Sequence, residues 1–167
     1  MKKNLFLALL GFGLIFQSCS NIDNKINITA SGSLQIDTAQ GSCPYLTKDI
    51  RGNIVLSWIR SYNDTNLIVC YAVSADSGKT FGNPIEIPAS TNVHPHGENM
   101  PKIIFKPSGE IIAVWGAGRH NPINPEAGLV VDSQSFDNGK TWNGANALVH
   151  DTASKDQRYF DVALLPN

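Results

Sequence analysis

Short apolar runs separated by turn-forming residues follow one another along most of the chain. The runs are rich in β-branched and aromatic residues and span about four to eight positions, a pattern that predicts strands. After the N-terminal apolar run, no segment has the periodicity of an amphipathic helix. The expected strands form two groups, at about 43–47, 53–60, 67–74 and 84–88, and at about 101–106, 110–116, 127–135 and 146–150.

The two groups of expected strands repeat one another in sequence. Pro44 and Gly52 stand at the same spacing as Pro101 and Gly109, and a third round begins at Phe160. Repeats of about 50 to 60 residues are typical of propellers and related arrays. In a propeller, a four-stranded antiparallel sheet is repeated radially as a blade. The chain is therefore expected to be all-β, with about two four-stranded antiparallel blades and the start of a third.

An eight-residue box follows the third expected strand of each group, SADSGKTF at Ser74–Phe81 and SFDNGKTW at Ser135–Trp142. Aspartate can fold back to accept backbone N–H groups, glycine supplies the positive φ of a tight turn, and the aromatic ring can pack on the sheet. A catalytic group does not ordinarily recur at equivalent positions of successive blades, so the boxes are expected to be structural. The residues in this role are Ser74, Asp76, Gly78, Thr80 and Phe81, and Ser135, Asp137, Gly139, Thr141 and Trp142.

These boxes, Ser-x-Asp-x-Gly-x-Thr-aromatic, resemble the Asp-box of the bacterial neuraminidase repeat family. The resemblance covers residues 41–167 and implies a sialidase-like β-propeller, six-bladed if complete. A ring of that size needs roughly 350 residues at this repeat length, so the sequence is expected to be a piece of a longer propeller. Some members of the family are exo-sialidases, and others bind only glycans or proteins.

The N-terminus predicts export from the cytoplasm. Met1-Lys2-Lys3 is basic and Leu5–Phe16 is apolar, but this run is shorter than the about 20 residues that a membrane-spanning helix needs. The residues up to Cys19 resemble a bacterial lipobox, which implies lipidation at Cys19 and anchoring in the cell envelope, periplasmic or surface-exposed. Simple secretion without a lipid is the alternative.

The repeat and the N-terminal signals divide the chain into consecutive segments. Residues 1–19 are expected to be the lipoprotein signal peptide with its cysteine, and residues 20–40 a tether that includes a candidate closing strand. The first blade is expected at 41–90, the second at 91–150, and the truncated start of a third at 151–167.

Candidate ligand contacts are expected at the end of the sheets opposite the boxes, where the second strand of each blade turns into the third. Arg60 and Asp64 resemble a loop of the family in which an arginine precedes the catalytic aspartate. The resemblance implies that Arg60 contacts the carboxylate of a sugar acid and that Asp64 is the acid/base, and a solvated polar loop is the alternative. Ser42 stands where the family carries a carboxylate-binding arginine, and it offers one neutral hydrogen bond instead of a charged bidentate pair.

His96, Glu98, Asn99 and Arg119 are the other candidate substrate contacts at that end. Two imidazoles and a carboxylate also suit zinc, but Pro95 and Gly97 make this segment a loop rather than a rigid ligand-bearing strand. No metal and no cofactor is therefore expected. A plain connector into the second blade is the alternative to a ligand-lining loop.

The cysteines and tryptophans within the repeats are expected to be structural. Cys43 and Cys70 fall on the first and third strands of one sheet, and strands two apart are separated by about 9.5 Å. A disulfide needs Cα atoms within about 7 Å, so two buried free thiols are expected. Trp58 and Trp115 occupy equivalent strand ends and are expected in the core.

Composition narrows the expected partners and functions. The formal net charge is −1 and there is no basic run, which argues against nucleic-acid binding. The expected partner is a glycan, sialylated or not, and the membrane is contacted through the lipid anchor only. The leading hypothesis is an exported sialidase-like lipoprotein that recognises a glycan and is catalytically incomplete in this sequence. The alternatives are an exo-α-sialidase whose full-length form completes the site, and a propeller that binds other proteins.

Overall fold

The computed structural model describes residues 31–118, 124, 127–148, 156–157 and 159–165. The chain divides into two units, Met1–Gly32 and Ser33–Asn167, and the fold described below is that of the second unit. Among the described residues, no helix has the length and apolar character needed to cross a membrane.

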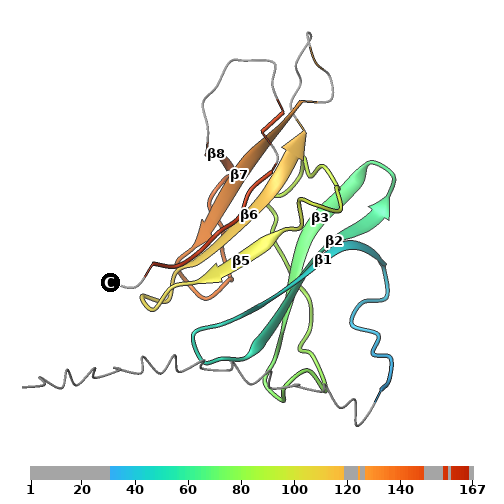
Figure 1. The fold of residues 1–167 in the computed structure, drawn as a ribbon, viewed down its shortest axis with the longest axis vertical. Helices are drawn as coiled ribbons and strands as arrows, with labels where there is room; N and C mark the ends of the chain where they lie inside the picture. Colours follow the sequence, from blue (N-terminus) through green and yellow to red (C-terminus); the bar gives the residue numbers. More distant parts are fainter. Residues whose placement is uncertain (1–30, 119–123, 125–126, 149–155, 158, 166–167) are drawn as a thin grey trace, which may run out of the picture. The chain divides into compact units, whose positions relative to one another are not determined.

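Two four-stranded antiparallel sheets make up the described fold, and in each sheet consecutive strands are neighbours (Figure 1). The first sheet contains β1 (Gln40–Lys48), β2 (Ile54–Asn63), β3 (Asn66–Ser74) and β4 (Ile85–Glu86). The second contains β5 (Lys102–Phe105), β6 (Ile111–Gly118), β7 (Gly128–Ser135) and β8 (Asn146–Ala147). The predicted all-β fold with two such sheets is confirmed. β1 and β2 are longer than expected, and β4 and β8 are shorter.

A β-bulge accounts for the length of β1. The pairing of β1 with β2 shifts between Ser42 and Tyr45, and Cys43 has a φ of 53°. Proline has no N–H to donate to a ladder, so a bulge is a place where a strand accommodates Pro44. Both cysteines are free, but Cys43 is only half-buried, unlike the buried thiol that was expected, because it lies in this bulge. Cys70 on β3 is buried, and burial raises the pKa of its thiol to about 12.

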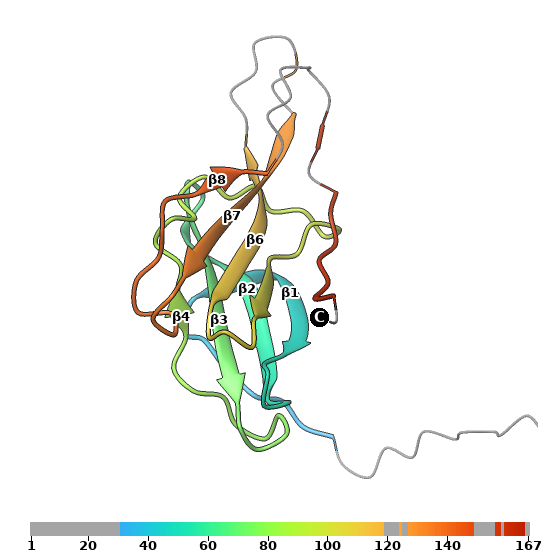
Figure 2. The same ribbon diagram turned by 90° about the vertical axis from the view of Figure 1, so that its left-hand side faces the viewer.

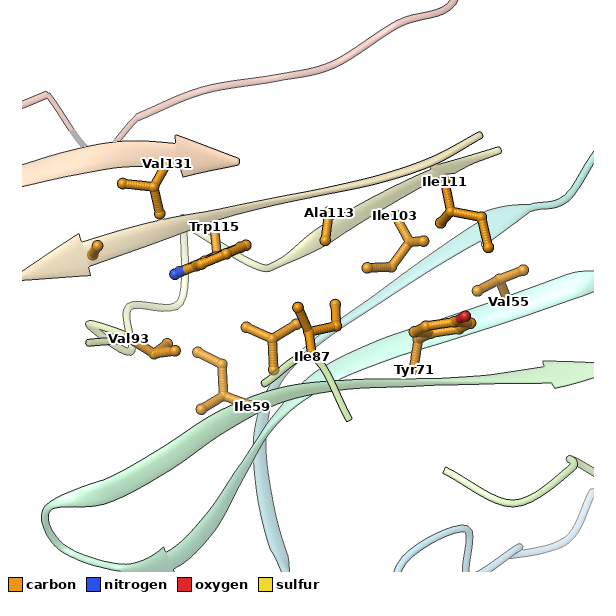
Figure 3. Packing of buried hydrophobic residues seen from close by; sticks show 12 residues of the cluster. Val55, Ile59, Tyr71, Ile87, Val93, Ile103, Ile111, Ala113, Trp115 and Val131 are labelled. Atoms are coloured by element: carbon orange, nitrogen blue, oxygen red, sulfur yellow. The ribbon is translucent and has the colours of Figure 1, made fainter. Parts of the chain in front are cut away.

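The two sheets pack face to face around one hydrophobic cluster (Figure 3). Alternate residues of each strand reach this cluster because side chains of a strand point in turn to its two faces. Burying one such side chain fully stabilises the fold by about 1.5–3 kcal/mol. The first sheet contributes Val55, Ile59, Val69 and Tyr71, the second contributes Ile103, Ile111, Ala113, Trp115 and Val131, and Ile87 and Val93 come from the connection between the sheets.

Equivalent residues of the two sheets face the same way along the stack. Trp115 lies in the cluster between the sheets, so it points from the second sheet towards the first. Trp58 occupies the equivalent position, and it lies in a smaller cluster on the outer side of the first sheet. Both tryptophans are buried, as expected. The aromatic residues of the boxes behave likewise, since Phe81 packs on that outer side and Trp142 packs against Tyr71 of the first sheet. The two sheets therefore stack with equivalent faces pointing the same way.

The two boxes lie at one end of the sheets, and the β2–β3 hairpin lies at the other. Ser74 pairs with the start of β2 and Ser135 pairs with the start of β6. Figure 2 shows β3 and β7 running towards the same end. We call the end that carries residues 74–81 and 135–142 the box end. The end that carries the β2–β3 turn and residues 92–99 is called the hairpin end.

The third round of the sequence repeat lies beside β5 without forming a strand. Lys102 of β5 donates from Nζ to the carbonyl oxygen of Phe160 at 2.7 Å and forms an ion pair with Asp161 at 3.0 Å. The same ammonium lies 4.8 Å from the ring centre of Phe160 and 5.3 Å from that of Tyr45. Among the described residues, no strand pairs with 160–165.

Candidate functional site

Arg60, whose side chain is largely buried, is held in a polar network on the outer side of the first sheet. Its Nε donates to Asp37 Oδ2 at 2.6 Å, and its Nη1 donates to Glu86 and, at 3.1 Å, to the hydroxyl of Tyr62. The side chain of Arg60 is 11% exposed. Burial alone would lower the pKa of Arg60, but the hydrogen bonds with Asp37 and Tyr62 raise it. Of the three guanidinium nitrogens of Arg60, Nη2 is the one that makes no hydrogen bond within the described part of the chain.

Asp37 holds the segment that precedes β1 against the same side of the sheet. Its Oδ2 also accepts the indole N–H of Trp58 at 3.1 Å, and its Oδ1 accepts the backbone N–H of Ala39 at 3.1 Å. Burial alone would raise the pKa of Asp37, but the hydrogen bonds from Arg60 and Ala39 keep this pKa below its ordinary value. The carboxylate therefore stays ionised, and Ile36 packs next to it on the Trp58 cluster.

Asp64 lies at the exposed tip of the β2–β3 hairpin. The turn is built by its neighbour Asn63, whose side-chain oxygen accepts the backbone N–H of Thr65 at 3.0 Å and of Asn66 at 2.8 Å. Among the described residues, none forms a hydrogen bond or an ion pair with the Asp64 carboxylate. The structure therefore exposes Asp64 at the hairpin end, but it does not join this carboxylate to Arg60.

Residues 92–99 run along the end of β6, also at the hairpin end. The backbone N–H of His94 donates to the carbonyl oxygen of Gly116 at 2.9 Å. The ring of His96 packs edge-on against that of Tyr159, with the ring centres 6.0 Å apart. This segment brings the expected candidates of the second blade to the same end of the sheets as Asp64.

The remaining predicted contacts differ in accessibility. Glu98 is exposed, whereas Asn99 is 1% exposed and thus lies inside the protein. The backbone N–H of Asn99 donates to the carbonyl oxygen of His96 at 2.9 Å and closes the turn. The part of the chain that the structure describes contains no group of three His, Cys, Asp or Glu side chains placed to hold a metal ion. Arg119 and His120 lie outside the described residues.

The two boxes build the same hydrogen-bonded turn. In the first box, Asp76 Oδ1 accepts the backbone N–H of Thr80 at 2.8 Å and Oδ2 accepts the hydroxyl of Thr80 at 2.6 Å. Ser74 Oγ accepts the N–H of Gly78 at 2.7 Å and donates to Asp76 at 2.8 Å. In the second box, Asp137 accepts the backbone N–H of Thr141 at 2.8 Å and its hydroxyl at 2.6 Å. Ser135 Oγ accepts the N–H of Gly139 at 2.8 Å and donates to Asp137 at 2.9 Å.

The hydrogen bonds of each box keep its aspartate ionised. The hydroxyl of Thr80 contributes most to lowering the pKa of Asp76 to about 2, and Thr141 has the same effect on the pKa of Asp137, also about 2. Every hydrogen bond described for these two carboxylates stays within its own box. The carboxylates therefore order their own turns, and both lie at the box end, away from the hairpin that carries Asp64.

The second box also packs on the first sheet. The ring of Trp142 meets the ring of Tyr71 edge-on, with centres 6.4 Å apart. The ring of Phe105 of β5 also meets the ring of Tyr71 edge-on, with centres 6.0 Å apart. Gly139 has a φ of +84°, and a Cβ atom added there would lie 2.4 Å from the hydroxyl of Tyr71. The glycine of this box thus supplies the turn conformation and the close approach to the neighbouring sheet.

A cavity of about 200 Å³ opens between the two sheets at the box end. Sequence reasoning placed no site at this end, because the lining comes from several separate segments and no local motif marks their meeting. Its lining combines apolar strand residues with charged residues of the β1–β2 and β5–β6 turns. The lining residues are Asp49, Ile50, Arg51, Tyr71, Val73, Ile85, Phe105, Lys106, Gly109, Glu110, Ile111 and Asn138.

Comparison with known proteins gives a partial match to a lipoprotein. No family model matches the chain. Over 79 residues, the chain is 39% identical to an uncharacterised lipoprotein of Mycoplasma genitalium, and the match covers 47% of this chain and 24% of that protein. The existence of this relative agrees with the expected lipid anchor, although Cys19 lies outside the described residues.

A solved structure also superposes on part of the chain. A Hadza microbial sialidase matches with a TM-score of 0.42 and 20% sequence identity, over 68% of this chain and 26% of the sialidase. The chain thus spans about a quarter of the length of each of these two proteins. What the comparisons and the fold establish together is an all-β chain of two four-stranded antiparallel sheets with a lipoprotein among its relatives.

Proposed function

We propose that the chain is part of an exported, lipid-anchored β-propeller that recognises a glycan at its hairpin end. The two sheets would be the first and second blades, at 41–90 and 91–150. Residues 20–40 would connect them to the anchor at Cys19, and 151–167 would begin the third blade. The like orientation of Trp58 and Trp115 supports radial stacking, because equivalent side chains of successive blades face the same neighbour.

The observation that carries the binding function, rather than hydrolysis, is the network around Arg60. Its guanidinium already pairs with Asp37 and hydrogen-bonds to Glu86 and Tyr62. Removing such a buried cation from its partners costs several kcal/mol, so it is poorly placed to capture a second carboxylate. Ser42 supplies no charge in place of the arginine that the family resemblance leads us to expect. A sugar that is bound through exposed polar groups needs neither a free Arg60 guanidinium nor an arginine at position 42.

Glycan recognition itself rests on the Asp-box resemblance and on the polar groups gathered at the hairpin end. Asp64 and Glu98 are exposed there, and His96 presents a half-buried imidazole. Carboxylates and imidazoles are hydrogen-bond partners for sugar hydroxyls. We therefore assign these three side chains as the candidate glycan contacts of the described chain, and Arg119 as a further candidate from the adjoining loop.

A glycan array with the intact protein tests this function. We expect binding to a subset of glycans that weakens at least fivefold in Glu98→Gln or Asp64→Asn, while Lys140→Gln at the box end leaves it unchanged. Incubation with a fluorogenic sialoside provides the second arm. Turnover that disappears in Asp64→Ala would replace the proposal with an exo-sialidase. If no glycan binds and the sialoside is not turned over, a propeller that binds proteins would be favoured.

A further inference from the structure

We propose that the cavity at the box end is a binding site for a small apolar carboxylate, with the hydroxyl of Tyr71 and the guanidinium of Arg51 as its polar contacts. The site lies at the end opposite the candidate glycan contacts. It does not depend on the function proposed above, and its test is separate.

The cavity walls are apolar and come from both sheets. Val73 and Ile85 line it from the first sheet, and Phe105 and Ile111 line it from the second. Three of these side chains are half-buried and Ile111 is 4% exposed. Small-molecule sites are usually concave, mostly apolar, and equipped with a few polar groups that orient the ligand. A volume of about 200 Å³ is below the roughly 300–1,000 Å³ of most ligand pockets, so the ligand can be no larger than about one aromatic ring with a substituent.

Tyr71 supplies a hydroxyl in the cavity wall that no described residue hydrogen-bonds. Its side chain is 1% exposed and its ring is fixed edge-on between Phe105 and Trp142. Figure 3 shows its oxygen on the side of Ile111, which also lines the cavity. Among the described residues, none forms a hydrogen bond with this hydroxyl. The hydroxyl is not among the fully buried atoms without a partner in the described residues, so it meets the cavity, where a ligand acceptor can bind it in place of water.

The Tyr71 hydroxyl is a hydrogen-bond donor at neutral pH. Burial raises the pKa of Tyr71 to about 12, so the group keeps its proton at neutral pH and can donate it in a hydrogen bond. The complementary group on a ligand is therefore an acceptor oxygen.

The charged residues at the rim point to the same ligand chemistry. Lys106 is paired with Glu110. The Asp49 carboxylate accepts the backbone N–H groups of Arg51 and Asn53 and the side-chain amide of Asn53, at 2.8, 2.9 and 2.9 Å. Within the described part of the chain, the Arg51 guanidinium takes part in no hydrogen bond or ion pair.

The polar groups of the cavity that make no hydrogen bond within the described residues are thus a phenol donor and the Arg51 guanidinium, which is attracted to the Asp49 carboxylate without being hydrogen-bonded to it. A carboxylate satisfies both, because guanidinium binds carboxylates through two parallel charged hydrogen bonds and a phenol donates to an anionic oxygen. An apolar body fits the walls. The ligand class is therefore an aromatic or branched aliphatic carboxylate, and a neutral alcohol of the same size is the natural comparison.

Calorimetric titration of the intact protein with benzoate, and separately with benzyl alcohol, tests the site. We expect benzoate to bind at least tenfold more tightly than benzyl alcohol and to shift the backbone amide signal of Gly139 in NMR spectra. Tyr71→Phe should weaken benzoate binding at least tenfold while the unfolding midpoint is unchanged, because the ring contacts remain and no hydrogen bond within the protein is lost. Arg51→Gln should weaken it similarly.

Lys79→Gln is the matched control, because Lys79 is an exposed cation of the first box that does not line the cavity. It should bind benzoate as the unmodified protein does. Absence of benzoate binding overturns the proposal, and so does binding that Tyr71→Phe leaves intact. An equal loss of affinity in Lys79→Gln and Arg51→Gln would reduce the effect to general electrostatics and would also overturn it.

Discussion

A single aspartate organises each box, and its ionisation is tied to the geometry of the turn. Asp76 and Asp137 each accept hydrogen bonds from a backbone N–H group and from the hydroxyl of the same threonine. These bonds exist with the carboxylate ionised, and they lower its pKa to about 2 from an ordinary value of 3.8. Because the folded-state pKa is depressed, the associated stability is present above pH about 4 and is lost as the pH falls towards 2.

The first prediction concerns this pH dependence. In the unmodified protein, the free energy of unfolding should fall as the pH drops from about 4 to about 2. Asp137→Asn should make that fall shallower, because one of the carboxylates with a depressed pKa is gone. Urea unfolding curves at a series of pH values measure the effect. Asp64→Asn is the control, since Asp64 is exposed and its removal should leave the slope unchanged. Identical slopes in Asp137→Asn and the unmodified protein would contradict the assignment.

The second prediction separates the two box glycines. Gly78 and Gly139 both have positive φ, so alanine at either position should cost about 1–2 kcal/mol of backbone strain. Only at Gly139 would the new Cβ meet a rigid ring, 2.4 Å from the hydroxyl of Tyr71, while at Gly78 the nearest atom is a methyl of Ile54 at 3.5 Å. Chemical denaturation should therefore show a larger loss for Gly139→Ala, about 3 kcal/mol in total. Adding Tyr71→Phe should recover part of it, and equal losses at the two glycines would count against the packing described.

At the scale of elements, the segment before β1 takes the place of a neighbouring sheet. It covers the outer side of the first sheet, which is equivalent to the side by which the second sheet packs on the first. Ile36 contributes an apolar contact and Asp37 contributes the polar one, to Trp58 and Arg60. A short segment is thus attached to a β-sheet by one ion pair, one indole hydrogen bond and a small apolar cluster.

The third prediction tests this attachment. Asp37→Ala leaves Arg60 largely buried with Glu86 as its remaining carboxylate, so the free energy of unfolding should fall by about 1–3 kcal/mol. The amide of Ala39 and the indole of Trp58 should exchange hydrogen faster, as measured by NMR. Glu86→Gln is the matched comparison. Its side chain is 38% exposed, whereas that of Asp37 is 12% exposed, so its effect should be smaller. The reverse order of the two effects would be inconsistent with this attachment.

At the scale of the whole molecule, the two sheets differ from a two-sheet sandwich in what covers their outer faces. In a sandwich, the outer faces of both sheets meet water. Here the outer side of the first sheet carries Trp58 and Phe81, and on the second sheet Lys102 is buried under Phe160 and Asp161. Residues of the chain itself, from the segment before β1 and from 160–161, therefore cover parts of both outer faces.

The fourth prediction concerns the attachment of the whole chain to the membrane. If Cys19 is lipidated, Cys19→Ala should move the protein from the membrane fraction to the soluble fraction of the exported material, because no other anchor is proposed. Mass spectrometry of the mature N-terminus should find acyl chains on Cys19 in the unmodified protein. Cys70→Ala is the control and should leave the fractionation unchanged. An unmodified Cys19 in a mature, membrane-bound protein would refute the anchor.

Local signals in the sequence determined the elements of this fold. The strands were predictable because a period of two and β-branched composition act within a few residues. The turns of both boxes were predictable because Asp76 and Asp137 meet partners no more than four residues away. Their placement at the end opposite the β2–β3 hairpin then follows from antiparallel pairing.

Long-range packing decided which side chains are free to act. Arg60 looked like a ligand contact in the sequence, but its partners Asp37 and Glu86 lie 23 and 26 positions away. Asn99 looked exposed in a polar loop and is buried. The cavity beside Tyr71 exists only because turns of two sheets meet over apolar strand residues. Sequence patterns report how a segment pairs and turns, whereas the identity of a side chain's neighbours depends on the stacking of sheets, which no local pattern encodes.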